Sequence, residues 1–499
     1  MRSIRRSRST AGLLAIAFLV AASACGADPP DQLMSPVPTD ATDVADEPDA
    51  TDVADEPDAT SAPAVNAAPE SASLVTSTAV AVSAPFGAIE EESQYSPVRW
   101  LVPWDDGFLA LGIEYPAQPL PEQLPPEIAE LFPPEVGELF PDGLPPTQQD
   151  AMDILNEAGL FDVVMDVLDA HPEAMDAVQS APRPAPELMA SWSTDGDLWI
   201  PTEMAVPIDV GDISHVGISG DRLTLAGVVR PPAAGDPWVV AIASTRDLEN
   251  WDTASMRVED SAGASELDQS WVAPIAAAAD DEHWVARVMI DLGGSMSASG
   301  YSELRDELWS AAWDGEPAIG ETDQQSWMLL ATSDGFLELG QHVGFSPDGQ
   351  TWTETSEPAP NVSFQAAAPL GDDVLALMGA PYGESSILVL DASGNTVTEV
   401  EIPELGDGFS AWNSTSSPAF ILQTGLPAPY EQTVVAEQPN LWLLATADGE
   451  TWLLHDLDEG DPDEFNPPML AAVNGTTVLT GTIGWEPGTD VWQRFTITE

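Results

Sequence analysis

SPDGQTW, residues 346–352, combines a turn signal with a tryptophan, and similar stretches recur at 193–199, 244–251 and 446–452. These copies are STDGDLW, STRDLENW and TADGETW. Each copy lies between two short runs rich in Val, Leu, Ala and Ile, which is the pattern of a β-hairpin with the copy as its turn. We call these four stretches the turn motifs. Around each of them the strand-like runs group into units of four.

Residues 71–499 have the texture of an all-β fold, with many short apolar runs bounded by Gly, Asp and Pro. A repeated four-stranded unit predicts a β-propeller. The last unit supplies only three clear strands, so we expect Ser73–Val82 to complete it as an N-terminal strand that closes the ring and removes its open edges. Seven blades fit best, and six or eight stay open because the third unit is poorly marked. The units cover residues 97–206, 213–259, about 270–320, 326–357, 362–403, 409–457 and 468–498.

The turn motifs resemble the Asp-box repeats, also called BNR repeats, of sialidase-like and sortilin-like propellers. The pattern of that family is Ser-x-Asp-x-Gly-x-Thr-Trp, or the same with Asp and Gly adjacent. The resemblance covers the β portion of the chain, outside residues 26–70 and 117–187. The matching positions are Ser346, Asp348, Gly349, Thr351 and Trp352; Thr446, Asp448, Gly449, Thr451 and Trp452; Ser193, Asp195, Gly196 and Trp199, with Leu198 in place of threonine; and Ser244, Asp247 and Trp251, without the glycine.

The chemistry of the turn motif is structural. Its Asp and Ser side chains can accept backbone N–H groups of their own turn. Its glycine supplies a positive φ, and its tryptophan buries a large face between strands. We therefore assign these residues to the fold and not to catalysis. The family resemblance implies that they lie on the propeller face opposite the ligand site.

The first 25 residues have the features of an export signal. Four arginines precede residue 9, and Ala11–Ala24 is a 14-residue apolar run, short for a membrane-spanning helix. The stretch ASACG at 22–26 resembles a bacterial lipobox, with Ala22 where leucine is usual. The resemblance implies that Cys25 is lipidated and that the exported protein is anchored on the outer face of the cytoplasmic membrane. The alternative is an ordinary secretory signal cut near Cys25, which leaves a free thiol.

Residues 26–70 predict a disordered acidic tether. They are rich in Pro, Asp, Ala and Thr and contain a perfect duplication, TDVADEPDA, at 42–50 and 51–59. The whole chain has 84 acidic and 13 basic residues, no lysine, and a formal net charge of −71. This charge excludes nucleic acid and anionic lipid headgroups as partners, so we expect membrane contact only through the lipid anchor. The acids are spread along the chain, which favours a solvated surface over a dedicated cation site.

The connections between second and third strands are long in most units, so binding loops are expected on one face of the ring. Four of the five tyrosines fall in these loops, each beside a glutamate. Such a rim could bind a sugar, a peptide or a cation; the alternative is that loops simply tolerate polar aromatic residues. The candidate ligand-binding residues are Tyr115, Arg230, Tyr301, Glu303, Arg305, Tyr382, Tyr430 and Glu431.

Residues 117–187 predict a helical insertion within the first unit. PPEIAELF at 125–132 and PPEVGELF at 133–140 each place proline at a helix start and glutamate in the first turn. Thr147 can cap a helix that runs to about Leu160. We expect a small subdomain packed on the loop face of the propeller, and a lid, a partner-binding surface and an inert insertion all stay open.

These features favour a non-catalytic binding or scaffold module for an unidentified protein or glycan. The alternative is a sialidase-like glycoside hydrolase. The family resemblance implies that such an enzyme needs an arginine triad, a Tyr/Glu nucleophile pair and an acidic Asp, and no arginine trio stands at equivalent positions of these units. A role in assembling a membrane complex is a third hypothesis that nothing in the sequence selects. The five histidines show no metal-ligand spacing, and we expect neither a metal site nor a cofactor.

Overall fold

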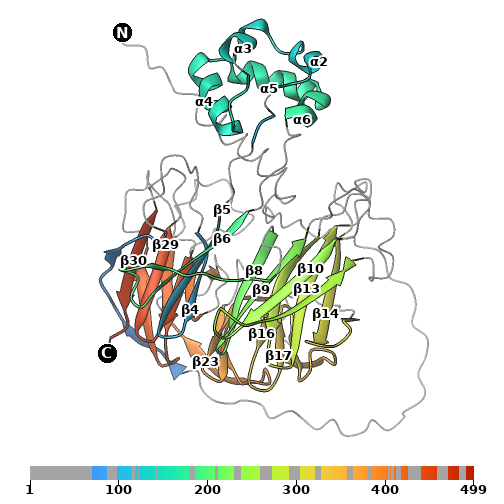
Figure 1. Ribbon diagram of the computed structural model, residues 1–499. Helices are drawn as coiled ribbons and strands as arrows, with labels where there is room; N and C mark the ends of the chain where they lie inside the picture. The colour runs from blue at the N-terminus through green and yellow to red at the C-terminus, as the bar shows by residue number, and fades with distance from the viewer. Residues whose placement is uncertain are drawn as a thin grey trace, which may run out of the picture.

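The computed structural model shows seven sheets arranged as the blades of a ring, with a group of helices beyond one end of the ring (Figure 1). The predicted all-β, seven-bladed propeller is therefore confirmed. The structure describes residues 70–86, 98–114, 119–178 except 122 and 142, 186–207, 212–229, 238–258, 272–291, 304–320, 328–356, 363–379, 385–402, 405, 409–411, 417–424, 440–457, 470–482 and 490–498.

The blades follow one another along the chain, and in blades 1 to 6 four antiparallel strands pair in sequence order. Blade 1 contains β4 (Val98–Trp104), β5 (Gly107–Glu114), β6 (Glu187–Ser193) and β7 (Ile200–Pro201); blade 2 contains β8 (Asp212–Ser219), β9 (Arg222–Val229), β10 (Val239–Thr245) and β11 (Trp251–Arg257); blade 3 contains β12 (Val272–Ala279), β13 (His283–Asp291), β14 (Leu304–Ala312) and β15 (Ala318–Gly320); blade 4 contains β16 (Met328–Ala331), β17 (Phe336–Leu339), β18 (Val343–Ser346) and β19 (Thr353–Ser356).

The remaining three blades take strands from both ends of the chain. Blade 5 contains β20 (Ser363–Leu370), β21 (Asp373–Gly379), β22 (Ser386–Leu390) and β23 (Thr396–Glu401), with β1 (Glu70–Ser71) on its outer edge; blade 6 contains β24 (Phe409–Ala411), β25 (Ala419–Thr424), β26 (Asn440–Thr446) and β27 (Thr451–Asp456), with β2 (Ser73–Val75) on its outer edge; blade 7 contains β28 (Leu470–Asn474), β29 (Thr477–Thr482), β30 (Val491–Thr496) and β3 (Val80–Val82).

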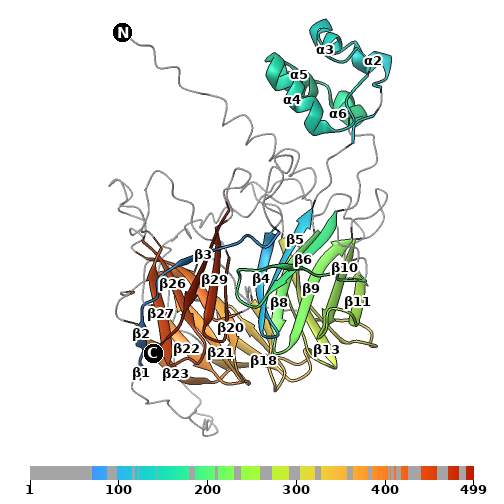
Figure 2. The same cartoon turned by 60° about the vertical axis from the view of Figure 1, so that its left-hand side comes forward.

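The N-terminal strand differs in part from the prediction. Val80–Val82 completes blade 7 as expected, antiparallel to β30. Ser73–Val75, which the prediction places in the same strand, pairs instead in parallel with β27 of blade 6. The preceding strand β1 pairs in parallel with β23 of blade 5. One segment therefore crosses the outer edges of three successive blades (Figure 2).

The hydrophobic core lies between the blades. Seven clusters of buried apolar side chains each combine residues of two neighbouring blades, one cluster for each interface of the ring. The first strands are rich in alanine, as in VAPIAAAA of β12 and SFQAAAPL of β20. Small side chains suit this position, because the blades converge there and leave little room for larger ones.

The turn motifs form the predicted self-bonded turns between third and fourth strands. Asp348 Oδ1 accepts hydrogen bonds from the backbone N–H of Gln350 at 2.9 Å and of Thr351 at 3.1 Å. The indole of Trp352 donates to Gly349 O at 3.1 Å. Asp448 and Trp452 repeat these bonds in blade 6. Hydrogen bonds from the side chain and backbone of Asn250 and the backbone of Glu249 lower the pKa of Asp247 to about 2 in blade 2.

The turn motifs also contact the preceding blade. A Cβ on Gly349 of blade 4 would lie 2.5 Å from Val285 Cγ2 of blade 3, and a Cβ on Gly196 of blade 1 would lie 2.6 Å from Leu479 Cδ2 of blade 7. In blade 2 the glycine position is taken by Leu248, which adopts φ 62° and packs in the cluster between blades 1 and 2. Each of these turns therefore fills a space beside its neighbour.

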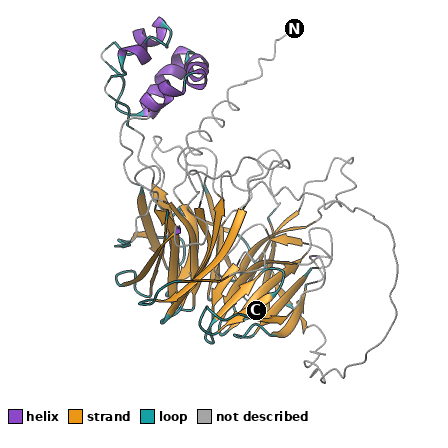
Figure 3. Ribbon diagram, turned by 90° about the vertical axis from the view of Figure 1, so that its right-hand side faces the viewer, coloured by secondary structure: helices purple, strands orange, loops and turns teal. Residues whose placement is uncertain are grey.

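The helical insertion joins β5 to β6 and contains α2 (Pro126–Ala129), α3 (Pro134–Leu139), α4 (Gln148–Ala158), α5 (Phe161–Ala170) and α6 (Pro172–Val178). Thr147 caps α4, because its Oγ1 accepts the Asp150 backbone N–H at 3.2 Å. The helices lie beyond the blade ends opposite the described turns, drawn in teal in Figure 3. None of the helices in the described part of the chain is long and apolar enough to span a membrane.

The insertion does not pack as expected. Its helices bury Val136, Leu155 and Val164 against one another, forming a small core of their own. In all three ribbon views they stand apart from the blades (Figures 1, 2 and 3). Leu155 of α4 and Val164 of α5 are buried within the helical group, whereas Ile154 and Val163 are exposed.

Candidate functional site

The predicted rim of tyrosines lies outside the described residues. Its members there are Tyr115, Arg230, Tyr301, Glu303, Tyr382, Tyr430 and Glu431. Arg305 falls in β14, opposite Ile290 of β13, and its side chain is also outside the description. The rim therefore stays a prediction. The chemistry that the structure does describe lies at the other end of the blades.

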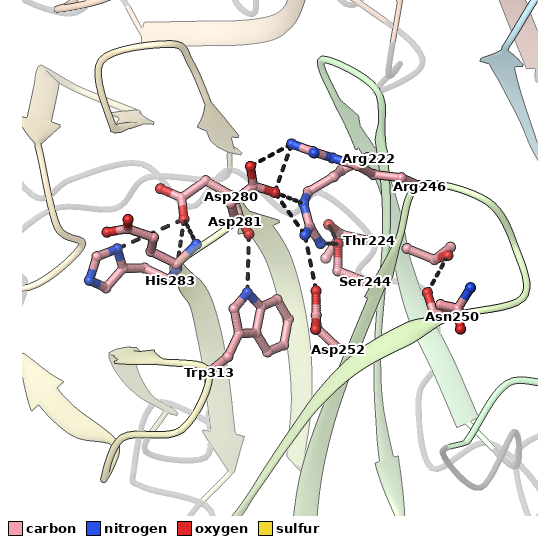
Figure 4. A network of polar contacts seen from close by, with 12 residues as sticks. Arg222, Thr224, Ser244, Arg246, Asn250, Asp252, Asp280, Asp281, His283 and Trp313 are labelled. Atoms are coloured by element: carbon pink, nitrogen blue, oxygen red, sulfur yellow. Dashed lines mark hydrogen bonds and ion pairs between the residues drawn. The ribbon is translucent and has the colours of Figure 1, made fainter.

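Arg222 is the centre of a polar network between blades 2 and 3 (Figure 4). It begins β9, directly after the tight turn from β8, and is only 7% exposed. Its Nε and Nη2 donate to Asp281 Oδ1 at 3.0 and 2.9 Å, and Nη2 also donates to Asp252 Oδ2 at 3.0 Å. Its Nη1 donates to Ser244 Oγ at 3.3 Å. One arginine thus joins three strands of blade 2 to the first turn of blade 3.

Arg246 extends this network at the surface. Its Nη2 lies 2.7 Å from the Asp281 carboxylate, and its Nε lies 3.1 Å from Asp221 Oδ1. The hydrogen bond from Arg222, followed by the charges of both arginines, lowers the pKa of Asp281 although burial opposes this. Asp281 therefore stays ionised and serves as the shared anion of the two arginines.

A hollow of about 590 Å³ opens beside this network, between the last strand of blade 2 and two turns of blade 3. Both tryptophans in its wall are held in place by their ring N–H groups. Trp313 Nε1 donates to Asp280 O at 3.0 Å, and Trp251 Nε1 donates to Leu248 O at 3.2 Å. The lining residues are Trp251, Asp252, Thr253, Asp281, Glu282, His283, Ala312, Trp313 and Asp314.

The lining gives the hollow a defined chemical character. Four carboxylates line it, while arginine approaches only through Arg222 and Arg246 behind Asp281, so negative charge is in excess. Glu282 and Asp314 lie on exposed turns at the rim. An aromatic wall with nearby carboxylates favours a guest with a positive charge or with several hydroxyl groups.

Sequence reasoning did not find this site. Trp251 was assigned a structural role in its turn motif, which it does fulfil through its bond to Leu248. Arg222 and Asp281 lie 59 residues apart, and no local pattern links them. The only available signal is the blade count, which places the first turns of neighbouring blades side by side.

The other described arginines whose side chains have assigned contacts also stabilise interfaces. Arg287, fully buried in β13, donates to Asp306 Oδ1 at 2.8 Å and to Glu338 Oε1 of blade 4 at 2.6 Å. Arg494 of blade 7 donates to Asp197 Oδ2 of blade 1 at 2.8 Å. Within the described residues no three arginines converge, and no group of His, Cys, Asp and Glu has a metal-binding arrangement.

Comparisons with solved structures find low similarity to several proteins. The sialidase of Trypanosoma rangeli matches with 11% identity and a TM-score of 0.29, covering 57% of this chain and 54% of that one. The β-propeller domain of the Trilobed protease from Pyrococcus furiosus, described as having an open velcro topology, matches with 12% identity and a TM-score of 0.28, covering 54% and 78%. A chain of the mitotic checkpoint complex matches with 13% identity and a TM-score of 0.32, covering 62% and 84%.

The chain spans about half the length of the sialidase that it matches. No family model matches the sequence, and no curated protein matches it.

Proposed function

We propose that this chain is a non-catalytic binding module, presented outside the cell by a lipid anchor at Cys25. The observation that carries the proposal is the use of its arginines. Arg222, Arg246, Arg287 and Arg494 each pair with carboxylates of the protein itself. An enzyme of the sialidase type needs arginines that face a substrate carboxylate, and in the part of the chain that the structure describes these four side chains are committed to interfaces between or within blades.

We also propose that the turn motifs are Asp-box repeats in the family sense. Their hydrogen bonds support this assignment, because the Asp carboxylate accepts N–H groups of its own turn in blades 1, 2, 4 and 6. An aspartate used in this way is not free to act as a general acid. The proposal therefore agrees with a binding role for the propeller.

The partner that fits the described surface is a protein with exposed basic side chains. The hollow between blades 2 and 3 offers two fixed tryptophans and an excess of carboxylates. A guanidinium or ammonium group would be stabilised by both features, by the tryptophans through cation–π contact and by the carboxylates through opposite charge. The strongly negative chain also raises the rate of encounter with basic partners.

The test uses the full chain and an arginine-containing tetrapeptide amide as the probe, with binding measured by calorimetry at low salt. We expect binding that weakens as salt rises. Replacing both rim acids, Glu282→Gln with Asp314→Asn, removes two exposed charges worth about 0.5–1 kcal/mol each. Binding should weaken roughly 5–30-fold, at about 1.4 kcal/mol per factor of ten.

The matched control is Asp372→Asn, which neutralises an exposed acid on the first turn of blade 5. It should leave peptide binding unchanged. Equal weakening by the control would mean that only the overall charge attracts the peptide, and the hollow would then have no specific role. Selective binding of a neutral oligosaccharide would replace the protein partner with a glycan, and release of sugar from a sialyl glycoside would refute the non-catalytic proposal.

A further inference from the structure

The N-terminal segment pairs with three blades in two different ways. Strands β1 and β2 are fifth strands, added in parallel to blades 5 and 6, which already have four strands each. Strand β3 is the fourth strand of blade 7, which has only β28, β29 and β30 without it. Loss of the first two strands would leave complete blades, whereas loss of β3 would leave an incomplete one.

Apolar side chains of this segment enter three successive interfaces of the ring. The residues that pack there are Ala72 and Leu74 between blades 5 and 6, Val75 and Ala79 between blades 6 and 7, and Val82, Ala84 and Phe86 between blades 7 and 1. The last interface is where the two ends of the propeller meet. The first part of the segment therefore covers the outer edges of complete blades, and its last part closes the ring.

The hydrogen bonds of the segment show the same difference between its two ends. Ala72 N donates to Glu401 O at 3.4 Å, which is long for a backbone hydrogen bond, and Ser73 N donates to Glu450 O at 3.2 Å, at the upper end of the usual range. At the closing end, Trp199 Nε1 of blade 1 donates to Ser83 O at 3.0 Å, and Thr496 N donates to Ser77 Oγ at 3.0 Å. The ring of Trp199 also lies edge-on to Trp492 of blade 7, with centroids 6.3 Å apart.

We infer that the segment opens in two steps, with residues 70–75 released from blades 5 and 6 while residues 80–86 keep the ring closed. Released residues 70–75 uncover the outer edges of β23 and β27. Residue 70 is the N-terminal end of the segment, so tension from the N-terminal side reaches β1 and β2 first. The propeller is thereby protected from opening when its N-terminal side is pulled.

The test is hydrogen exchange by mass spectrometry on the full chain. Amides of residues 70–75 should exchange about 10-fold or more faster than those of 80–82, because local opening requires less free energy than opening of the ring. Leu74→Asp should increase exchange in residues 70–75, β23 and β27 and leave β30 unchanged. Val82→Asp should increase exchange along β30 and lower the melting temperature.

The matched control is Val80→Asp on the closing strand itself, because the Val80 side chain is 47% exposed and its replacement buries no charge. It should resemble the wild type. Two results would overturn the inference: equal exchange rates for residues 70–75 and 80–82, or faster exchange of β30 in Leu74→Asp. Either would mean that the segment opens as one unit.

Discussion

The contact between turn motif and preceding blade predicts the effect of one methyl group. Gly349 has φ 73°, and a Cβ there would lie 2.5 Å from Val285 Cγ2 and 3.3 Å from Ser310 Cβ. Val285 is fully buried and β-branched, so its methyl group cannot easily turn away. Gly371, on the first turn of blade 5, has φ 64° and no atom within 4 Å of its Cβ position. Gly349→Ala and Gly371→Ala thus share backbone strain and differ only in the contact.

The two substitutions should differ measurably in stability. An alanine at positive φ costs about 1 kcal/mol, which both variants lose. Overpacking against Val285 adds about 1–3 kcal/mol in Gly349→Ala alone. An unfolding entropy of about 2.1 cal/mol/K per residue over roughly 430 residues gives about 0.9 kcal/mol/K. We therefore expect the melting temperature to fall by about 1 °C for Gly371→Ala and by about 2–4 °C for Gly349→Ala.

Urea unfolding followed by tryptophan fluorescence, with differential scanning calorimetry beside it, measures both values on the same preparations. The midpoints should shift with an unchanged slope, as expected for a change in stability alone. Equal shifts for the two variants would refute the reasoning, because the turn would then tolerate a side chain against blade 3. In that case the glycine would serve only its own backbone conformation.

Three further changes have outcomes that the structure predicts. Arg287→Met leaves the buried Glu338 without its cation and should cost about 3–5 kcal/mol in chemical unfolding, partly recovered by adding Glu338→Gln; no recovery would contradict the buried pair. Burial lowers the pKa of His215 from 6.5 to about 4, so its contribution, up to about 3 kcal/mol, is present above pH 6.5 and lost as pH falls towards 4. His215→Gln should flatten the plot of melting temperature against pH in that window, and an unchanged slope would contradict this. Asp448→Ala removes acceptors for two backbone N–H groups and should cost about 1–3 kcal/mol while peptide binding at the blade 2–3 hollow stays intact; loss of binding would place function near the turn motif of blade 6.

Blade boundaries could be predicted because their signals are local. A turn motif is specified by its own Asp, Gly and Trp, and strands on both sides follow from short apolar runs. The third unit, expected at about 270–320, is observed as β12–β15 over 272–320 although it has no turn motif. Its alternating strands and the spacing of the neighbouring units were sufficient to predict it.

The path of residues 70–82 could not be predicted in full, because pairing on an outer edge leaves little trace in sequence. Short runs such as Ser73–Val75 and Val80–Val82 have similar composition, and both can form strands. The pairing partner is selected by which interface each apolar side chain fills, Leu74 between blades 5 and 6 and Val82 between blades 7 and 1. That choice depends on the assembled ring.

The candidate site escaped prediction for the same physical reason. The hollow is lined by the last strand of blade 2 and by the first and the third-to-fourth turns of blade 3, and the adjoining Arg222 follows the first turn of blade 2. Sequence reasoning took the turn motifs as markers of the face away from function. The described hollow, with its paired arginines and tryptophans, nevertheless lies on that face.

The position of the hollow follows from where the turn motif is absent. The turn motifs of blades 1, 4 and 6 place a glycine against the preceding blade, and Gly394 does the same in the third-to-fourth turn of blade 5. In blade 2, the side chain of Leu248 packs against the preceding blade instead. The corresponding turn of blade 3, beginning at Trp313, has no such residue, and Gly315 there contacts only its own turn. At the interface of blades 2 and 3, the Arg222–Asp281 pair supplies the connection instead, and the space that a turn motif would fill stays open. Introducing a complete turn motif into blade 3 should therefore close the hollow, raise stability and weaken peptide binding, which would link the absence of the motif in blade 3 to the proposed site.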